Sequence, residues 1–179
     1  MVRLMPRIPI LSALALAAGL AACTPTLGPP PPGRMGPSAG AFRGEDFAWS
    51  TESGSGSIAG HLAYQKGRVR YTCAKGTVIL TPETPWTRRR MQALYLSSEA
   101  AALPADEVRA RTPSAPSGDY SAFVRKATCD AASRFSFAGL PDGAWYAITI
   151  VKPATGEGAG IALMKRVVTQ GGKVSPLAL

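Results

Sequence analysis

The stretch formed by residues 129–151 constrains the fold more than any other part of the sequence. Phe135 and Phe137 alternate with small or polar residues, and the run 145–150 is rich in aromatic and β-branched residues, as is typical of β-strands. The Pro-Asp-Gly sequence at 141–143 offers a preset φ followed by a residue that tolerates positive φ. The pattern therefore predicts a β-hairpin, with Phe135 and Phe137 on its buried face.

This stretch resembles the carboxypeptidase regulatory-like domain, a small prealbumin-like β-sandwich. In that family an Asp-containing turn precedes an F-x-F strand, an L-P-x-G turn and a strand that opens with Tyr. The matching residues are Asp130, Phe135, Phe137, Leu140, Pro141, Gly143 and Tyr146, and residues 76–80 fit the family's G-x-V-x-L strand. The resemblance implies an all-β fold, a single Ig-like or prealbumin-like antiparallel β-sandwich.

Other short segments also have strand patterns. Residues 57–64, 161–169 and 174–179 are predicted as strands, and 69–74 and 77–81 as a second hairpin.

Between residues 84 and 120 the strand pattern lapses. Thr84 and Pro85 fit the cap and first residue of a helix, and residues 98–111 are helix-prone around Pro104. An alternative interpretation makes 91–97 a strand. Compact domains seldom contain long structureless connections, so we expect any specialised function to lie in this excursion.

The N-terminus has the features of a secretory leader. Within residues 1–22, Arg3 and Arg7 precede a short apolar run, and Leu-Ala-Ala leads to Cys23. This ending resembles a bacterial lipobox, which implies that Cys23 is lipidated and becomes the first residue of the mature protein. An ordinary leader with an incidental cysteine is the alternative. A multiply acylated terminus anchors stably. Because Thr24 rather than Asp follows, the resemblance implies the outer membrane, facing the periplasm.

Residues 23–56 are crowded with proline, glycine and serine and predict a spacer before a domain at 57–179. Phe42, Phe47 and Trp49 interrupt this composition. They either pack on the domain, stay mobile or bind a partner.

Cys73 and Cys129 are the cysteines that remain when Cys23 is lipidated. Because an exported protein meets an oxidising environment, we expect a disulfide between them, with two buried free thiols as the alternative. The single histidine, His61, and the lack of C-x-x-C spacing argue against a metal site, and no cofactor is expected.

The mature chain is basic. The full sequence has a net charge of +9, and removing Arg3 and Arg7 with the leader gives 9 − 2 = +7. Arg88, Arg89 and Arg90 form the densest basic cluster and are candidates to bind phosphates of an anionic envelope polymer, with a solvated helix face as the alternative. Basic composition alone does not indicate nucleic acid, and an exported protein meets lipid headgroups and acidic glycans first.

The sequence contains no nucleophile elbow, phosphate loop, metalloprotease helix or dinucleotide fingerprint, and His61 has no evident catalytic partners. We therefore predict no enzyme, but a non-catalytic binding, adhesion or structural module, held at the membrane by its N-terminal lipid. Its expected partners are an anionic envelope polymer or another envelope protein. The alternatives are a hydrolase or glycan-processing accessory with its site in 84–120, and a small-ligand carrier.

Overall fold

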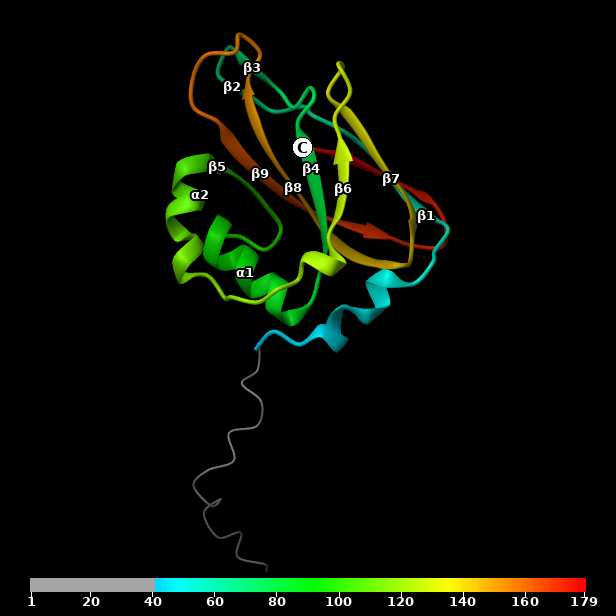
Figure 1. Cartoon of the computed structure of the whole chain (residues 1–179). Helices are drawn as coiled ribbons and strands as arrows, with labels where there is room; N and C mark the ends of the chain where they lie inside the picture. Colours follow the sequence, from blue (N-terminus) through cyan, green and yellow to red (C-terminus); the bar gives the residue numbers. More distant parts are fainter. Residues whose placement is uncertain (1–40) are drawn as a thin grey trace, which may run out of the picture. The chain divides into compact units, whose positions relative to one another are not determined.

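The computed structural model describes residues 41–179, which form a sandwich of two β-sheets with two α-helices on one outer face (Figure 1). The all-β sandwich with a partly helical excursion is therefore confirmed. The leader and Cys23 lie outside the described residues. None of the helices in residues 41–179 is long and apolar enough to cross a membrane.

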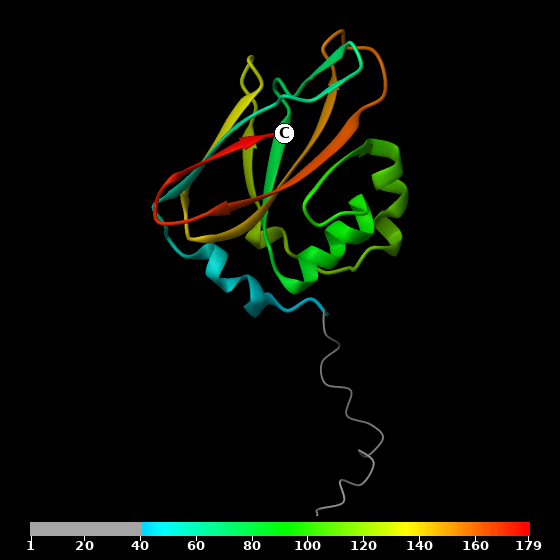
Figure 2. The same cartoon turned by 180° about the vertical axis from the view of Figure 1, so that it is seen from behind.

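The smaller sheet has the strand order β10–β1–β7. Its middle strand, β1 (Gly56–His61), is antiparallel to β7 (Arg134–Leu140) and parallel to β10 (Val174–Ala178). The first and last strands of the domain therefore lie side by side (Figure 2).

The larger sheet is built around β8 (Gly143–Pro153), the longest strand. Across this sheet the order is β6 (Arg125–Thr128), β4 (Thr77–Pro82), β8, β9 (Ile161–Thr169) and β5 (Ala100–Pro104), all antiparallel. β3 (Val69–Thr72) pairs with the far end of β8, and β2 (Gln65–Lys66) pairs with β3.

The main core fills the space between the two sheets. Ile58, Leu80, Phe135, Phe137, Leu140, Trp145, Val151 and Leu163 are among its buried side chains. The buried Trp145 indole donates a hydrogen bond to Thr169 Oγ1 at 3.0 Å, so its one polar atom has a partner. The predicted burial of Phe135 and Phe137 is confirmed, and Leu140 and Tyr146 are buried as well.

The two predicted hairpins are wrong in their pairing. β7 and β8 both exist, but they lie in different sheets, and their apolar faces pack across the core instead of along one sheet. β3 and β4 do not pair with each other either, because both pair with β8 at successive positions. Alternation shows that a strand has one buried face, but it does not show which strand lies beside it.

The excursion contains two helices and an edge strand. α1 (Pro85–Tyr95) begins as predicted, with Thr84 Oγ1 accepting the Thr87 N–H at 3.1 Å and proline in the first turn. The alternative strand at 91–97 is wrong, because α1 includes residues 91–95. The helix expected within 98–111 is confirmed for α2 (Ala105–Arg111) but not for the residues before it, which form β5. Short 3-10 turns η2 (Thr112–Ser114) and η3 (Ser121–Phe123) lead on to β6.

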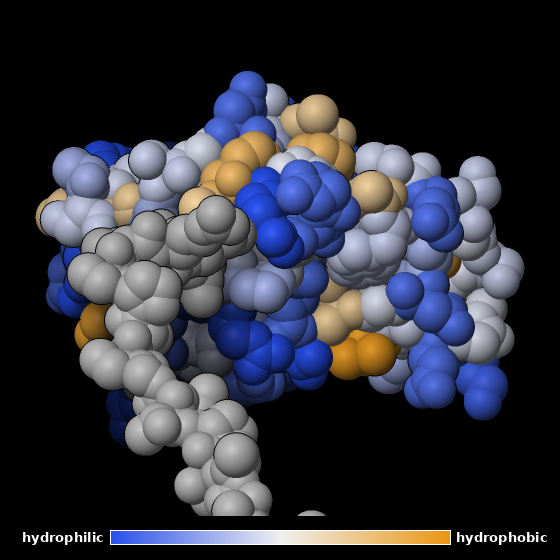
Figure 3. Space-filling model, turned by 90° about the horizontal axis from the view of Figure 1, so that it is seen from below, coloured by the Kyte–Doolittle hydropathy of each residue, from blue (hydrophilic) through white to orange (hydrophobic). Residues whose placement is uncertain are grey.

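Residues 41–55, which we call the N-terminal strap, pack against one end of the sandwich. They contain the 3-10 helix η1 (Gly44–Thr51). Phe47 is fully buried, with its ring 4.9 Å from Phe123 and 6.1 Å from Trp86, and Trp49 lies edge-on to Trp145 at 4.9 Å. Seen from this end, the part not drawn in grey is mostly hydrophilic with scattered apolar residues (Figure 3). Of the outcomes left open for Phe42, Phe47 and Trp49, packing on the domain is the one observed. Residues 41–55 therefore pack with the folded domain, although their composition predicts a spacer.

Candidate functional site

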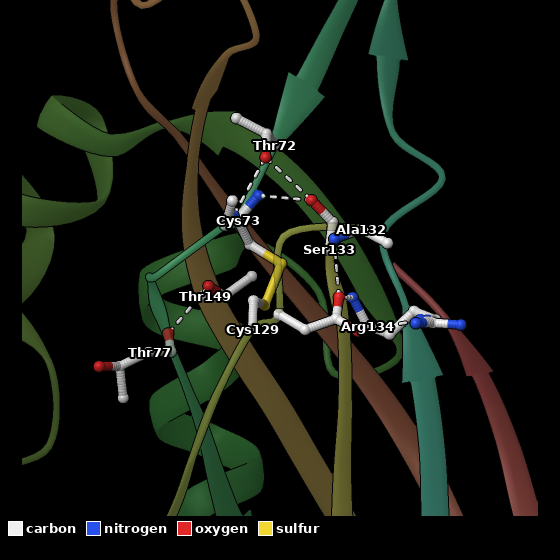
Figure 4. The surroundings of a disulfide bond; sticks show 10 residues. Thr72, Cys73, Thr77, Cys129, Ala132, Ser133, Arg134 and Thr149 are labelled. Carbon is white, nitrogen blue, oxygen red and sulfur yellow. Dashed lines mark hydrogen bonds and ion pairs between the residues drawn. A yellow bond between two sulfur atoms is a disulfide. The ribbon is translucent and has the colours of Figure 1, made fainter.

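The predicted disulfide between Cys73 and Cys129 is confirmed. Both cysteines are buried, and their Cα atoms are 5.7 Å apart, at the ends of β3 and β6 (Figure 4). Beside the bond, Ser133 has a positive φ of 57° and its hydroxyl accepts the Cys73 N–H at 3.2 Å. The Asp130 carboxylate accepts the backbone N–H groups of Ala132 and Arg134, and these bonds, that of Arg134 first, hold its pKa below the ordinary value. The disulfide and these hydrogen bonds therefore stabilise the turn between β6 and β7.

The three consecutive arginines of α1 do not form one cluster. Arg88 pairs with Glu83, while Arg90 turns inward, donates to the Pro116 carbonyl at 2.6 Å and lies over the rings of Trp86 and Tyr120. Arg90 therefore packs inside the domain, with its Nε buried, and does not present its guanidinium to an external anion. Anion binding by Arg88 and Arg89 stays a prediction.

Glu83 is the centre of a small charged network under α1. Its carboxylate accepts from Arg166 at 2.6 Å and pairs with Arg88, and the Tyr146 hydroxyl donates to it at 3.3 Å. Burial, with the nearby Glu83 charge, raises the pKa of Tyr146 to about 12. With both arginines beside it, this carboxylate fixes the start of α1 to the sheet.

Within residues 41–179 the single histidine stands apart and no metal-binding cluster forms. His61 lies exposed on β1, and none of the described side chains hydrogen-bonds to its ring. No three His, Cys, Asp or Glu side chains of this part of the chain are grouped so that they could hold a metal.

The outer face of the larger sheet carries a groove of about 470 Å³ that we call the sheet-face groove. Its floor is formed by β4, β8 and β9, and one wall by α2. The lining residues are Thr77, Ile79, Tyr95, Ala105, Val108, Arg109, Thr112, Ile148, Thr149, Ile150 and Ala162. A second hollow of about 320 Å³, lined by residues 118–121, Val124 and Lys126, shares Ile79 with it. Ligand sites of small molecules have volumes in this range.

The floor is aliphatic and unusually open. Ile148 and Ile79 are half-buried, and Ile150 is 52% exposed. On the smaller sheet the corresponding outer face carries polar residues such as His61 and Ser136. Exposed aliphatic side chains that lie together in a hollow indicate a surface for binding.

The wall follows from the sequence of α2. Ala105, Val108, Arg109 and Thr112 are spaced as one face of a helix, and all four line the groove. The Arg109 guanidinium is held by Asp106 at 2.5 Å, on a helix that α1 and β9 support. This places an exposed, ion-paired guanidinium at the rim of an apolar floor.

Two further groups bear on the chemistry of the groove. Burial raises the pKa of Tyr95 to about 12, so its phenol stays neutral. In the adjoining hollow, hydrogen bonds from the Ser121 hydroxyl and backbone N–H hold the pKa of Asp119 below the ordinary value, so this carboxylate stays ionised and accepts hydrogen bonds. Both groups suit hydrogen bonding to a polar ligand more than proton transfer.

Sequence reasoning placed specialised function in the excursion, and the groove wall does come from it. It missed the floor, although a signal was present, because Ile148 and Ile150 make β8 apolar on both faces. A strand that is apolar on both faces is typical of a sheet covered on both sides. Here the helices cover the outer face of β8 only in part, since Ile150 is 52% exposed.

The fold has a counterpart of known structure. A Pseudomonas aeruginosa protein, whose crystal structure is described as that of a "putative carbohydrate binding protein", superimposes with a TM-score of 0.58 and 23% sequence identity, covering 77% of this chain and 96% of that one. At this identity the likeness shows a shared β-sandwich fold. The sequence matches no family model and no curated protein.

Proposed function

We propose that this protein is a non-catalytic binding module of the bacterial envelope that holds a carbohydrate in the sheet-face groove. The observation that carries the proposal is the exposed aliphatic floor of Ile79, Ile148 and Ile150 beneath a polar rim. The description of the Pseudomonas aeruginosa neighbour as carbohydrate-binding supports the ligand class.

The groove suits the two kinds of surface that a sugar presents. A pyranose ring has faces of C–H groups, which an aliphatic floor removes from water, and edges of hydroxyl groups, which need hydrogen-bond partners. Thr77, Arg109 and Thr112 supply such partners at the rim, and Asp119 and Ser121 supply them in the adjoining hollow. The combination of an apolar floor with a few polar groups is the usual composition of a ligand site.

The same residues favour binding over glycan hydrolysis. Glycosidases use two carboxyl groups, one of which has a raised pKa and donates a proton. Among the described residues that line the two hollows, Asp119 is the only carboxylate, and its pKa is lowered. The hydrolase alternative therefore lacks its second group here, whereas the ligand-carrier alternative would use the same groove.

The test is to titrate the protein with a panel of neutral oligosaccharides by NMR and to follow the methyl signals of the isoleucines. We expect Ile79, Ile148 and Ile150 to shift with a saturating sugar. Ile150→Ala should weaken binding several-fold without unfolding the domain, because this side chain is half exposed. Val168→Ala is the matched control, since Val168 is 46% exposed on the same sheet outside the groove. If sugars shift only residues outside the groove, or both variants bind alike, the proposed site is wrong.

We further propose that the domain is exported and anchored through Cys23, with its resemblance to carboxypeptidase regulatory-like domains as the family context. The lipobox-like Leu-Ala-Ala-Cys ending and the preceding basic and apolar segments support this. Cys23→Ser should abolish incorporation of labelled palmitate and release the protein from the membrane fraction, with Cys73→Ser as a control that keeps the label. Normal labelling of Cys23→Ser would contradict the anchor.

A further inference from the structure

A separate hollow of about 680 Å³ lies between the β2–β3 hairpin and the β8–β9 loop, and we call it the basic cleft. Both elements lie at the end of the domain opposite to the N-terminal strap in both views (Figures 1 and 2). Apolar side chains, among them Tyr71, Pro153 and Ile161, line part of the cleft. Its charged lining residues are Lys66, Arg68, Arg70 and Glu157.

The walls of the cleft are held in place by backbone contacts. At the tip of the hairpin Gly67 has a φ of 61°, the positive value that a two-residue hairpin loop needs at its first position. The Ala154 N–H donates to the Arg70 carbonyl at 2.9 Å, which joins the β8–β9 loop to the hairpin. Tyr71 in turn packs on Tyr64 with ring centroids 5.2 Å apart. The cations are therefore presented by a supported hairpin.

The three cations of the cleft lack partners. Lys66, Arg68 and Arg70 make no ion pair or side-chain hydrogen bond with any residue of the described part of the chain. Elsewhere in the described residues, arginines do pair with carboxylates three or four residues away in the sequence. These arginines are Arg43, Arg109, Arg111 and Arg134. By the pairing register Lys66 shares its face of the hairpin with Val69 and Tyr71, whereas Arg70 lies on the other face. Lys66 and the tip residue Arg68 are therefore the charges that the recess offers to an anionic ligand.

We propose that the basic cleft binds an acidic polysaccharide through its anionic groups. The cations recognise the charges, with arginine suited to bidentate contact, while Tyr71 and Pro153 offer apolar surface to the sugar rings. A recess admits a chain but not a bilayer surface, which disfavours a membrane as the occupant. Glu157 opposes the anion and limits affinity. The proposal does not depend on the sheet-face groove, which shares no lining residue with the cleft.

The test uses the full mature chain and polygalacturonate as the probe, with neutral dextran and phosphatidylglycerol vesicles as comparisons. We expect binding to polygalacturonate to weaken with salt and with loss of the cleft cations, and any binding to dextran in the sheet-face groove to respond to neither. Lys66→Ala/Arg68→Ala should weaken binding roughly tenfold, because two exposed ion pairs with the polymer are lost. Glu157→Gln should tighten binding. Val168→Ala, on β9 outside both hollows, should leave binding unchanged.

Lys173→Ala is the control for net charge, since Lys173 is exposed at the β9–β10 turn, outside the cleft. It is compared with the single variant Arg68→Ala, and circular dichroism checks that each variant is folded. Equal weakening by the two would show that overall charge alone attracts the polymer and would overturn the cleft. Binding to the vesicles but not to polygalacturonate would replace the polysaccharide with a lipid surface, and an unchanged double variant would also overturn the proposal.

Discussion

Replacing Phe47 tests whether the N-terminal strap belongs to the folded domain. Phe47 is fully buried, and its ring lies 4.9 Å from Phe123, 5.3 Å from Phe42 and 6.1 Å from Trp86. A fully buried phenylalanine truncated to alanine costs about 3–5 kcal/mol. That is a large share of the roughly 5–15 kcal/mol by which domains are stable. We therefore expect Phe47→Ala to lower the denaturation midpoint strongly.

The stability that Phe47→Ala can remove from the sandwich is limited by the free energy with which the strap docks. If the cost of the substitution exceeds the free energy that docks the strap, the strap detaches and leaves the rest of the sandwich folded. Trp49 and Trp86 would then be exposed, because one lies on the strap and the other under it. Urea unfolding followed by tryptophan emission separates the two cases. Detachment shifts the native emission to the red and lowers the m-value, since less surface remains to be exposed.

Two variants serve as controls for Phe47→Ala. Glu45→Ala changes an exposed strap residue, whose side chain is 72% accessible, and should stay within about 0.5 kcal/mol of the parent. Phe47→Leu keeps most of the buried apolar surface and should be intermediate. If Phe47→Ala changes neither the midpoint nor the native emission, the docked strap is wrong and residues 41–55 are a spacer, as their composition predicts.

Three other outcomes follow from the core and the disulfide. Cys73→Ser and Cys129→Ser should each lose about 4 kcal/mol in urea unfolding, because the bond closes a loop with a sequence separation of 56, and clearly unequal losses would contradict a shared bond. Phe137→Ala should cost about 3–5 kcal/mol by the same assay, and a loss under about 1 kcal/mol would contradict its burial in the core. The pKa of Tyr95 and of Tyr146 is raised from 10.0 to about 12, so their stabilisation is complete below pH 10 and lost as pH rises toward 12. The Tyr95→Phe/Tyr146→Phe variant should show a shallower alkaline loss in midpoint-against-pH measurements, and an identical slope would refute this.

The sequence predicted the strands well but not their neighbours. A connection of two residues, Pro141 and Asp142, usually joins strands that pair, and here it joins strands of different sheets. The Leu140 carbonyl, at the end of β7, lies against the strap, so close that a Cβ on Gly54 would be 2.0 Å from its oxygen. Those contacts come from a segment whose glycines and serines predict flexibility. The same composition here serves close backbone packing.

For a similar reason, the sequence predicted the cysteine pair correctly but not the arrangement of the arginines. The Cys73–Cys129 pair could be predicted because few cysteines were available and the environment was inferred, without any knowledge of strand order. Arg88, Arg89 and Arg90 are adjacent in sequence, but successive positions on a helix point in different directions. Arg90 therefore faces the aromatic cluster while Arg88 meets Glu83. Adjacency in a sequence is weak information about adjacency in space on a helix.

The groove arises where the outer cover of the larger sheet ends. Tyr146, Ile148 and Ile150 occupy alternate positions on the outer face of β8 and form a series of increasing exposure, from fully buried through half-buried to 52% exposed. α1 covers the first of these, and α2 reaches the last only from one side. A sequence shows that both faces of β8 are apolar, but the extent of the cover depends on how α1, β5 and α2 are placed by contacts distant in sequence. The difference between the apolar area of the sheet and the area that the helices cover is what leaves room for a ligand.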